Sequence, residues 1–416
     1  MATMDLISKK LIFCFPFRHG PGGVNMLFLR LANYLSRQNY QVAIVDYPDG
    51  DMANNNDEGL ELISYDDDRA AQIPDNVILI FQSMTPWSIF PMLDIPPNTH
   101  VFFITTLPAN FYPVLPGRFR TKMYEGGVIA KVLWQTFLLN EYLKSKKFLN
   151  LIERTRSHAI LDANISCNLE KSLKVHLNSC QFLPLFSEDS RKNEFFESFE
   201  APSDVIKLGW VGRLSDFKIS ILNRVVKDAF RFSNENKKKV EFYIVGDGEY
   251  ASSLIDLSSN YFTIHRLSYI KPSELNKFML SLGMLFAMGT SALDGAKLGV
   301  PTVRLDYSYL EIPKSYRYKF FYEIHGFSLG EKIGGSCFQN GFHTFDDLMV
   351  EWEANMSEMS RKTYEFYINN HSLSNSAKLF IDYLGRGDLT WGDLKNKKLQ
   401  TSFIYSLWTK VKARNG

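Results

Sequence analysis

The sequence predicts an α/β protein with two Rossmann-like, doubly wound parallel-sheet domains. Short apolar runs rich in Val, Ile and Phe alternate with amphipathic helical stretches, a pattern typical of parallel sheets covered by helices. The alternation is interrupted once, at residues 187–205, where the sequence is polar and unpatterned, and it then resumes. Several apolar runs end directly in turns rich in Gly, Ser or Thr, and ligands bind at this edge of such sheets.

This pattern divides the 416 residues into four segments. We expect an N-terminal domain at residues 1–186, a linker at 187–205, a C-terminal domain at 206–385 and a tail at 386–416. Domains usually contain roughly 100–200 residues, so the length alone allows two or three of them.

The composition disfavours several classes of protein. A net charge of +2 gives no broad basic face for nucleic acid, and the four cysteines have no CxxC spacing, so no zinc site is indicated. No apolar run approaches the ~20 residues needed to cross a bilayer. The apolar run near the N-terminus also lacks the small-residue cleavage site of a signal peptide. We therefore expect a cytoplasmic protein.

The first domain opens with a predicted βαβ unit, formed by a strand at 10–17, a helix at 26–36 and a strand at 41–46. The loop inside this unit contains Gly20, Gly22 and Gly23, which let the backbone approach a ligand closely. Because these glycines do not fit GxGxxG, dinucleotide binding is disfavoured. Four further strands are expected in this domain, at 76–82, 99–105, 159–162 and 181–185, with helices at 128–147 and 164–175.

A proline-rich loop containing Asn110 follows the strand at 99–105, and a short basic and aromatic stretch follows at 118–122. Such a loop lies at the carboxyl end of a parallel strand, where ligands bind. Asn110, Arg118 and Arg120 are therefore candidate contacts to an acceptor that carries phosphate or lies at a membrane. The alternative for the basic stretch is a solvated turn.

The second domain repeats the alternation, and its central stretch is residues 285–305. There an apolar run leads through Gly289, Thr290 and Ser291 into a short helix expected at 292–298, and a new strand follows. The amino terminus of such a helix is a natural seat for a phosphate. We place Asp294 in its first turn, where the alternative role is an acid that interacts with the helix dipole. The other strands expected in this domain are at 206–211, 240–245 and 263–267, with helices at 219–232, 250–258 and 272–281.

Three stretches of the second domain resemble, in order, the donor half of glycosyltransferases with the GT-B fold, closest to the retaining, metal-independent family 4 type. They are Gly212-Arg213-Leu214 with Lys218, Ile244-Val245-Gly246-Asp247-Gly248, and Asp294-Gly295-Ala296 leading to Gly299-Val300-Pro301. The resemblance extends over nearly all of residues 10–385. It implies that the first domain faces the acceptor and the second binds a nucleotide sugar.

The resemblance also implies roles for individual residues. Arg213 and Lys218 would act catalytically by neutralising the diphosphate of the departing nucleotide; the alternative is a surface pair beside Asp216. Asp294 would accept hydrogen bonds from ribose hydroxyls. No metal or other cofactor is expected, because the two cations and a helix terminus would do the work of a metal ion. Further donor contacts are implied for Gly22, Gly23, Gly212, Gly246, Gly248, Gly289, Thr290, Ser291, Ala292 and Leu293.

The sequence departs from the family at two positions. The family's first glutamate, eight positions before Asp294, falls on Phe286, and a histidine that relatives often carry in the first domain falls on Leu107. His19 in the glycine-rich loop is the nearest substitute, as a contact to acceptor or donor, with a plain loop histidine as the alternative.

Two charged stretches have simpler alternatives. Asp66-Asp67-Asp68 contains the DxD pattern of the other glycosyltransferase fold, but without a flanking apolar strand it is interpreted as a solvated loop. Residues 395–416 contain six Lys or Arg between apolar residues. This stretch is either a terminal helix packed on the protein or a basic anchor on the inner face of an anionic membrane.

The function that the sequence favours is transfer of a sugar from a nucleotide-diphosphate sugar to a glycan acceptor. A lipid-linked acceptor in the assembly of surface polysaccharide, such as O-antigen or capsule, fits the basic stretches. The alternatives are a non-catalytic subunit that binds sugar nucleotides, or a sugar-nucleotide epimerase of the same fold. The expected partners are a nucleotide sugar, a glycan and a membrane surface, and not nucleic acid.

Overall fold

The computed structural model describes residues 6, 8–18, 23–83, 92–111, 132, 136, 138–178, 180–189 and 204–400. His19, Gly22, Arg118 and Arg120, residues 190–203 of the expected linker and residues 401–416 of the tail lie outside these ranges. The chain forms two compact units, one of Met1–Leu183 with Ser376–Gly416 and the other of Pro184–Asn375. Each is described separately.

The first unit contains a six-stranded parallel sheet with the order β3-β2-β1-β5-β7-β8. Its central strands are buried from end to end, as expected where helices cover both faces of a sheet. The strands are β1 (Lys10–Cys14), β2 (Val42–Asp46), β3 (Glu61–Ser64), β5 (Val77–Gln82), β7 (His100–Thr105) and β8 (His158–Ile160). Two short strands, β4 (Ala71–Gln72) and β6 (Leu93–Asp94), form a separate parallel pair.

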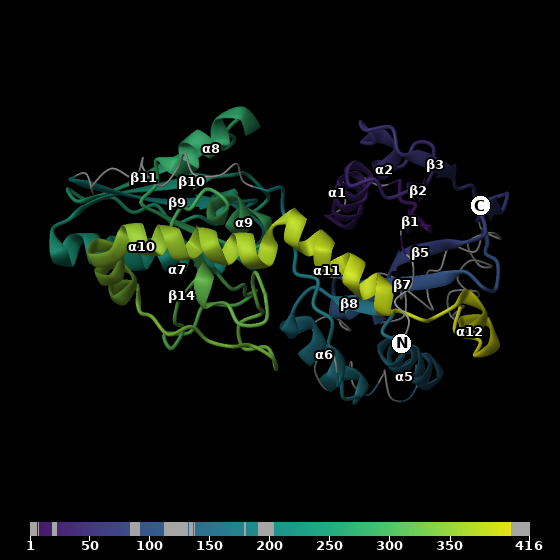
Figure 1. The fold of residues 1–416 in the computed structure, drawn as a ribbon. Helices are drawn as coiled ribbons and strands as arrows, with labels where there is room; N and C mark the ends of the chain where they lie inside the picture. Colours follow the sequence, from purple (N-terminus) through teal and green to yellow (C-terminus); the bar gives the residue numbers. More distant parts are fainter. Residues whose placement is uncertain are drawn as a thin grey trace. The chain divides into compact units, whose positions relative to one another are not determined.

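Helices from both ends of the chain contribute to the first unit (Figure 1). Phe380 packs on Phe13 and Phe102 of the sheet, with ring centroids 5.9 and 5.7 Å apart. Residues 376–385, which the sequence analysis placed in the second domain, therefore contact the first sheet. The helices are α1 (Gly23–Arg37), α2 (Asp51–Asn54), the 3-10 helix η1 (Pro108–Phe111), α5 (Leu139–Arg154), α6 (Ala163–Leu173), the end of α11 (Leu373–Arg386) and α12 (Trp391–Asn396).

The second unit contains a sheet with the order β11-β10-β9-β12-β13-β14, in which only β14 runs antiparallel to its neighbour. The strands are β9 (Val205–Val211), β10 (Lys239–Val245), β11 (Phe262–Leu267), β12 (Met284–Ala287), β13 (Thr302–Arg304) and β14 (Lys319–Phe320). The helices are α7 (Asp216–Asn236), α8 (Pro272–Leu280), α9 (Thr290–Ala296) and α10 (Phe345–His371), with 3-10 turns η3 (Ala251–Ser253) and η4 (Phe321–Glu323).

Both large sheets have the same topology. In each, the first strand of the sheet in chain order lies third, the next two extend the sheet to one side and the last three extend it to the other. This is the order of a doubly wound Rossmann-like sheet, and the order reverses between β1 and β5 in the first unit and between β9 and β12 in the second. The predicted fold class, α/β with two Rossmann-like doubly wound units, is confirmed.

Four local predictions were wrong. The strand expected at 181–185 is only an isolated bridge, in which Phe182 pairs with Ile160. The helix expected at 250–258 is only the 3-10 turn Ala251–Ser253. The stretch before Asp66 is a strand, β3, and Asp294 is the fifth residue of α9 and not part of its first turn.

None of the helices in the described ranges is long and apolar enough to cross a bilayer.

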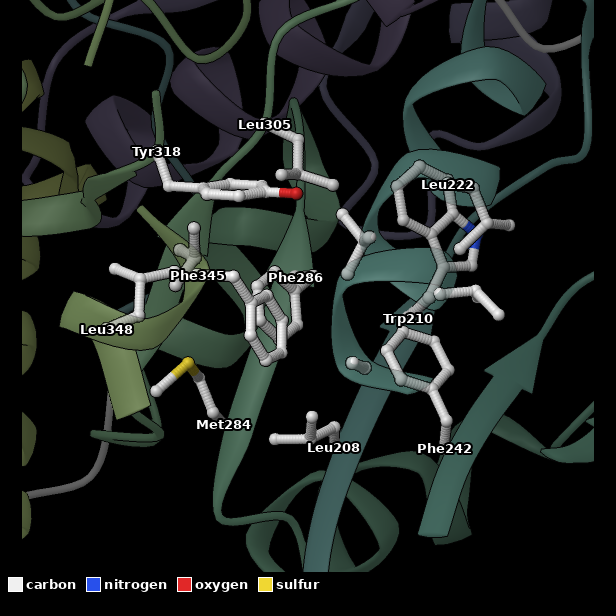
Figure 2. Close-up of a cluster of buried hydrophobic side chains, with 14 of the residues drawn as sticks. Leu208, Trp210, Leu222, Phe242, Met284, Phe286, Leu305, Tyr318, Phe345 and Leu348 are labelled. Carbon is white, nitrogen blue, oxygen red and sulfur yellow. The ribbon is translucent and has the colours of Figure 1, made fainter. Parts of the chain in front are cut away.

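The core of the second unit lies between its sheet, α7 and the start of α10 (Figure 2). Aromatic and branched side chains from alternate positions of β9, β10 and β12 point to this side of the sheet because successive side chains of a strand face opposite ways. Trp210, Phe242 and Phe286 are among them, and each is fully buried. This packing fixes the ends of β9 and β12, where the candidate site begins.

Candidate functional site

The candidate site of the second unit lies at the carboxyl ends of β9 and β12, where the strand order reverses. These two strands are parallel neighbours, with Trp210 paired to Phe286. The parallel register therefore brings the chain after β9, which begins at Gly212, level with the chain after β12, which begins at Met288. Ligands of doubly wound sheets bind at such a position.

The first two of the three predicted stretches touch each other through their backbones. The amide of Gly212 donates to the carbonyl of Val245 at 3.0 Å. A Cβ on Gly246 would lie 2.0 Å from the Gly212 oxygen, and one on Gly248 would lie 2.2 Å from the Leu214 oxygen. Close packing of these two loops therefore requires both glycines, and their contact with a nucleotide remains a prediction.

Arg213 and Lys218 form a pair of cations at the end of β9. Lys218 belongs to the first turn of α7, and its Nζ lies 3.7 Å from where a Cβ on Gly212 would stand. Lys218 is half-buried, whereas Arg213 is exposed. Burial, and to a smaller extent the charge of Arg213, lowers the pKa of Lys218.

No carboxylate within the described ranges forms an ion pair with Arg213 or Lys218. Among residues 204–400, neither side chain has a hydrogen bond or an ion pair, and the Lys218 ammonium lies 5.7 Å from the centroid of the Phe217 ring. Two adjacent positive charges without a counter-charge repel each other, and a bound anion would remove that repulsion. The alternative from the sequence is a surface pair beside Asp216. The Asp216 carboxylate accepts from the Phe217 amide at 2.8 Å, and within residues 204–400 it forms no ion pair with either cation.

The amino terminus of α9 lies on the neighbouring strand connection. Gly289 precedes the helix with φ +63° and ψ −139°, a conformation that favours glycine, and a Cβ there would meet no atom within 4 Å. The space beside Gly289 is therefore open to a ligand. Asp294 lies further along α9 with its carboxylate 3.3 Å from the Lys297 ammonium, and its side chain is 34% exposed. A role in binding ribose stays a prediction for Asp294.

The missing glutamate has a structural explanation. Phe286 lies inside β12 and is fully buried, and the connection from β12 to α9 consists only of Met288 and Gly289. The side chain at position 286 therefore belongs to the core of the second unit.

Two predicted residues of the first unit fall within the described ranges. Gly23 is the first residue of α1, and a Cβ there would meet no atom within 4 Å. The Asn110 side chain accepts from the amides of Thr106 and Leu107, each at 3.0 Å, and so holds the loop after β7. These bonds give Asn110 a structural role, and its contact with an acceptor remains a prediction.

Sequence reasoning missed a buried polar cluster beneath this loop. The Thr105 hydroxyl donates to Ser83 at 2.8 Å and is hydrogen-bonded to Nε2 of His158. Burial lowers the pKa of His158 to about 3, so its ring is neutral. The only signal in the sequence is the change from apolar to hydroxyl side chains at the ends of β5 and β7.

Asp67, in the middle of the stretch that contains the DxD pattern, forms a hydrogen bond and an ion pair within the first unit. Asp67 accepts from the Tyr47 hydroxyl at 2.8 Å and pairs with Arg18 at 3.5 Å, while the Arg18 guanidinium lies 3.8 Å from the centroid of the Tyr47 ring. Within the part of the chain that the structure describes, no group of three His, Cys, Asp or Glu is placed to hold a metal ion.

Comparison with known proteins gives likeness in structure only. A scan against protein-family models finds no match, and a search of curated proteins finds none. Among solved structures, the chain resembles a glycosyltransferase from Rickettsia africae ESF-5, at 11% identity and a TM-score of 0.49, over 91% of this chain and 98% of that one. It also resembles the apo form of the lipopolysaccharide outer core galactosyltransferase WaaB (10% identity, TM-score 0.49, 90% of this chain and 99% of that one). A third is WaaG, a glycosyltransferase involved in lipopolysaccharide biosynthesis (12% identity, TM-score 0.46, 90% and 99%). Likeness at this level leads to no conclusion about what this chain binds.

Proposed function

We propose that this chain is a retaining glycosyltransferase that moves a sugar from a nucleotide-diphosphate sugar to a glycan acceptor without a metal ion. The observation that carries the proposal is the pair of cations, Arg213 and Lys218, at the reversal point of the second sheet, where none of the described residues supplies a counter-charge. Their positions match the motif stretches that resemble the donor half of family 4 enzymes, and retention of configuration rests on that resemblance alone.

Sugar transfer from a nucleotide-diphosphate donor is favoured by positive charge at the departing group. When the bond from the sugar to the donor phosphate breaks, negative charge develops on the departing diphosphate. Arg213 can bind phosphate oxygens through two N–H groups, and Lys218 supplies a second positive charge at a fixed place on α7. Because both cations are in position before the reaction, they stabilise the developing charge without rearrangement. A metal ion, which other enzymes use for this purpose, is then not needed.

We further propose that the acceptor is a lipid-linked glycan of surface polysaccharide assembly, reached by a cytoplasmic protein at the inner face of the membrane. The support comes from the sequence, in the basic and aromatic stretch at 118–122 and the basic tail at 395–416. Arg118 and Arg120 would meet the acceptor phosphate, and Asn110 would orient the loop that leads to them.

One observation favours a second function. Phe286 is buried where the resemblance places a glutamate, and no carboxylate lies between it and Asp294. A subunit that binds sugar nucleotides without consuming them would not need that glutamate. Binding and turnover must therefore be measured separately.

Thermal unfolding with EDTA present tests binding, with UDP, GDP, CMP and their common sugars as ligands. We expect one nucleotide family to raise the unfolding midpoint by mass action, and Arg213→Ala to abolish the shift. Lys227→Ala, which removes an exposed lysine of α7, is the matched control and should keep the shift. No shift with any nucleotide would overturn the proposal.

The donor that binds is then followed for consumption. Release of nucleoside diphosphate that depends on a glycan acceptor identifies a transferase. Formation of a second sugar nucleotide without acceptor identifies an epimerase, and binding without consumption identifies a binding subunit.

A further inference from the structure

Ser215 occupies the position before α7 where a serine normally caps a helix, but it does not cap this one. In the usual arrangement, the serine oxygen accepts from the amide of the second or third helical residue. Here the Phe217 amide donates to the Asp216 carboxylate at 2.8 Å, and the Lys218 amide donates to the Ser215 carbonyl at 3.0 Å. Both amides are engaged elsewhere, and the Ser215 side chain forms no cap bond.

The Ser215 hydroxyl is buried without a partner. The residue is only 8% exposed, and its Oγ has no hydrogen bond to any residue that the structure describes. A buried hydroxyl without a partner is destabilising, because it has lost its bonds to water and gained nothing in return. A ligand that accepts a hydrogen bond at this point would satisfy it.

The surroundings define that ligand as an anion. Ser215 lies at the positive end of the dipole of a 21-residue helix. The unpaired cations Arg213 and Lys218 flank it in the sequence, and the Lys218 ammonium stands beside Gly212 at the end of β9. The one acid of this helix end, Asp216, is exposed and already bound to the Phe217 amide. An oxygen of a phosphate group would accept from the hydroxyl and be held by both cations.

We infer that Ser215 is a binding residue for the donor diphosphate, to which it donates its hydroxyl hydrogen. This inference rests on the proposed function and adds a residue to its site. From the sequence alone, Ser215 would be interpreted as the cap of α7. The inference assigns it a different role, as a ligand to phosphate. The two roles predict opposite effects on the stability of the free protein.

Ser215→Ala tests the inference when ligand binding and stability are measured together. The probes are pyrophosphate, UDP, GDP and CDP, titrated calorimetrically with EDTA present, because the base of the nucleotide is not known. The matched control is Ser220→Ala, a serine of the same helix outside its first turn. For the probe that binds, we expect Ser215→Ala to raise Kd about tenfold to a hundredfold, in line with one lost bond to a charged group, and Ser220→Ala to leave it unchanged. Without ligand, Ser215→Ala should unfold at or above the wild-type temperature.

The results for Ser215→Ala distinguish failure of the inference from failure of the proposed function. An unchanged Kd in Ser215→Ala, with clear binding to the wild type, overturns the inference and leaves the proposed function intact. A lower unfolding temperature of unliganded Ser215→Ala also overturns it, because this is the behaviour of a helix cap, whose loss costs roughly 0.5–2 kcal/mol. If the wild type binds none of the probes, the proposed function fails, and the inference fails with it. Ser215→Thr keeps the hydroxyl and should retain more affinity than Ser215→Ala.

Discussion

The ring of Phe286 lies nearly parallel to the ring of Phe345 in an offset stack, with centroids 5.8 Å apart and ring planes 8° apart (Figure 2). Phe286 comes from β12 and Phe345 from the first turn of α10, so the contact joins the sheet to the helix that covers it. The position that the family resemblance assigns to a glutamate is thus part of the core. If this chain transfers a sugar, it does so without a carboxylate from that position.

Introducing a glutamate at position 286, as the family resemblance suggests, should therefore destabilise the protein. Replacing a buried phenylalanine by a small residue costs ~3–5 kcal/mol, and a buried carboxylate without a partner adds to that cost. We expect Phe286→Glu to lower the free energy of unfolding by more than ~3 kcal/mol, measured by urea denaturation. Phe286→Leu, which stays apolar, should cost less. A Glu variant with wild-type stability would show that the side chain reaches solvent and that the core is arranged differently.

Removing Arg213 should change the titration of Lys218. The pKa of Lys218 is lowered by burial first and by the Arg213 charge second. In Arg213→Gln the repulsion disappears while burial remains, so the pKa of Lys218 should rise toward, without reaching, that of a free lysine. Lysine side-chain NMR over a pH series measures it directly, and Lys227→Gln serves as the control. An unchanged pKa would mean that the two cations do not share a site.

The succession of strands and helices could be predicted from the sequence because buried parallel strands are continuous apolar runs. The apolar run before Gly289 is observed as the strand Met284–Ala287, and the strand expected at 240–245 is observed as Lys239–Val245. β3 escaped prediction because it is short and borders a polar loop, and three of its four residues are exposed. β14 has two residues and depends on its partner β13, not on a pattern of its own.

The candidate site could be predicted only in part, for a different physical reason. The spacing of Gly212, Arg213 and Lys218 indicates a strand end that leads into a helix, so these positions were accessible from sequence. The unsatisfied hydroxyl of Ser215 was not, because a serine before a helix predicts an ordinary cap. Only the hydrogen bonds of the neighbouring amides show that the cap bond is missing.

Two glycines of the site should respond differently to alanine. A Cβ on Gly246 would lie 2.0 Å from the Gly212 oxygen, which is backbone and cannot move aside, whereas a Cβ on Gly289 would meet no atom within 4 Å. Gly289→Ala should cost only the strain of an alanine held at φ +63° and ψ −139°, a backbone conformation that residues other than glycine rarely adopt, roughly 1–3 kcal/mol. Gly246→Ala should cost more and also separate the loops after β9 and β10. Urea denaturation of both variants compares them, and equal costs would contradict the close packing of these loops.

His158 should make the stability of the protein fall in mild acid. Its pKa is about 3 in the folded protein because of burial, against 6.5 for the ordinary histidine. Between these values the unfolded chain binds a proton that the folded protein does not. The stability that depends on neutral His158 is therefore complete above pH 6.5 and is lost as the pH falls toward 3, by about 1.4 kcal/mol per pH unit.

His158→Gln removes this dependence but also the bond to Thr105, so it should be less stable than the wild type at pH 7.5 and closer to it at pH 5. Urea denaturation at the two pH values measures the difference, in which the other titrating groups cancel. A gap between wild type and variant that does not narrow at pH 5 would show that His158 accepts a proton in the folded state.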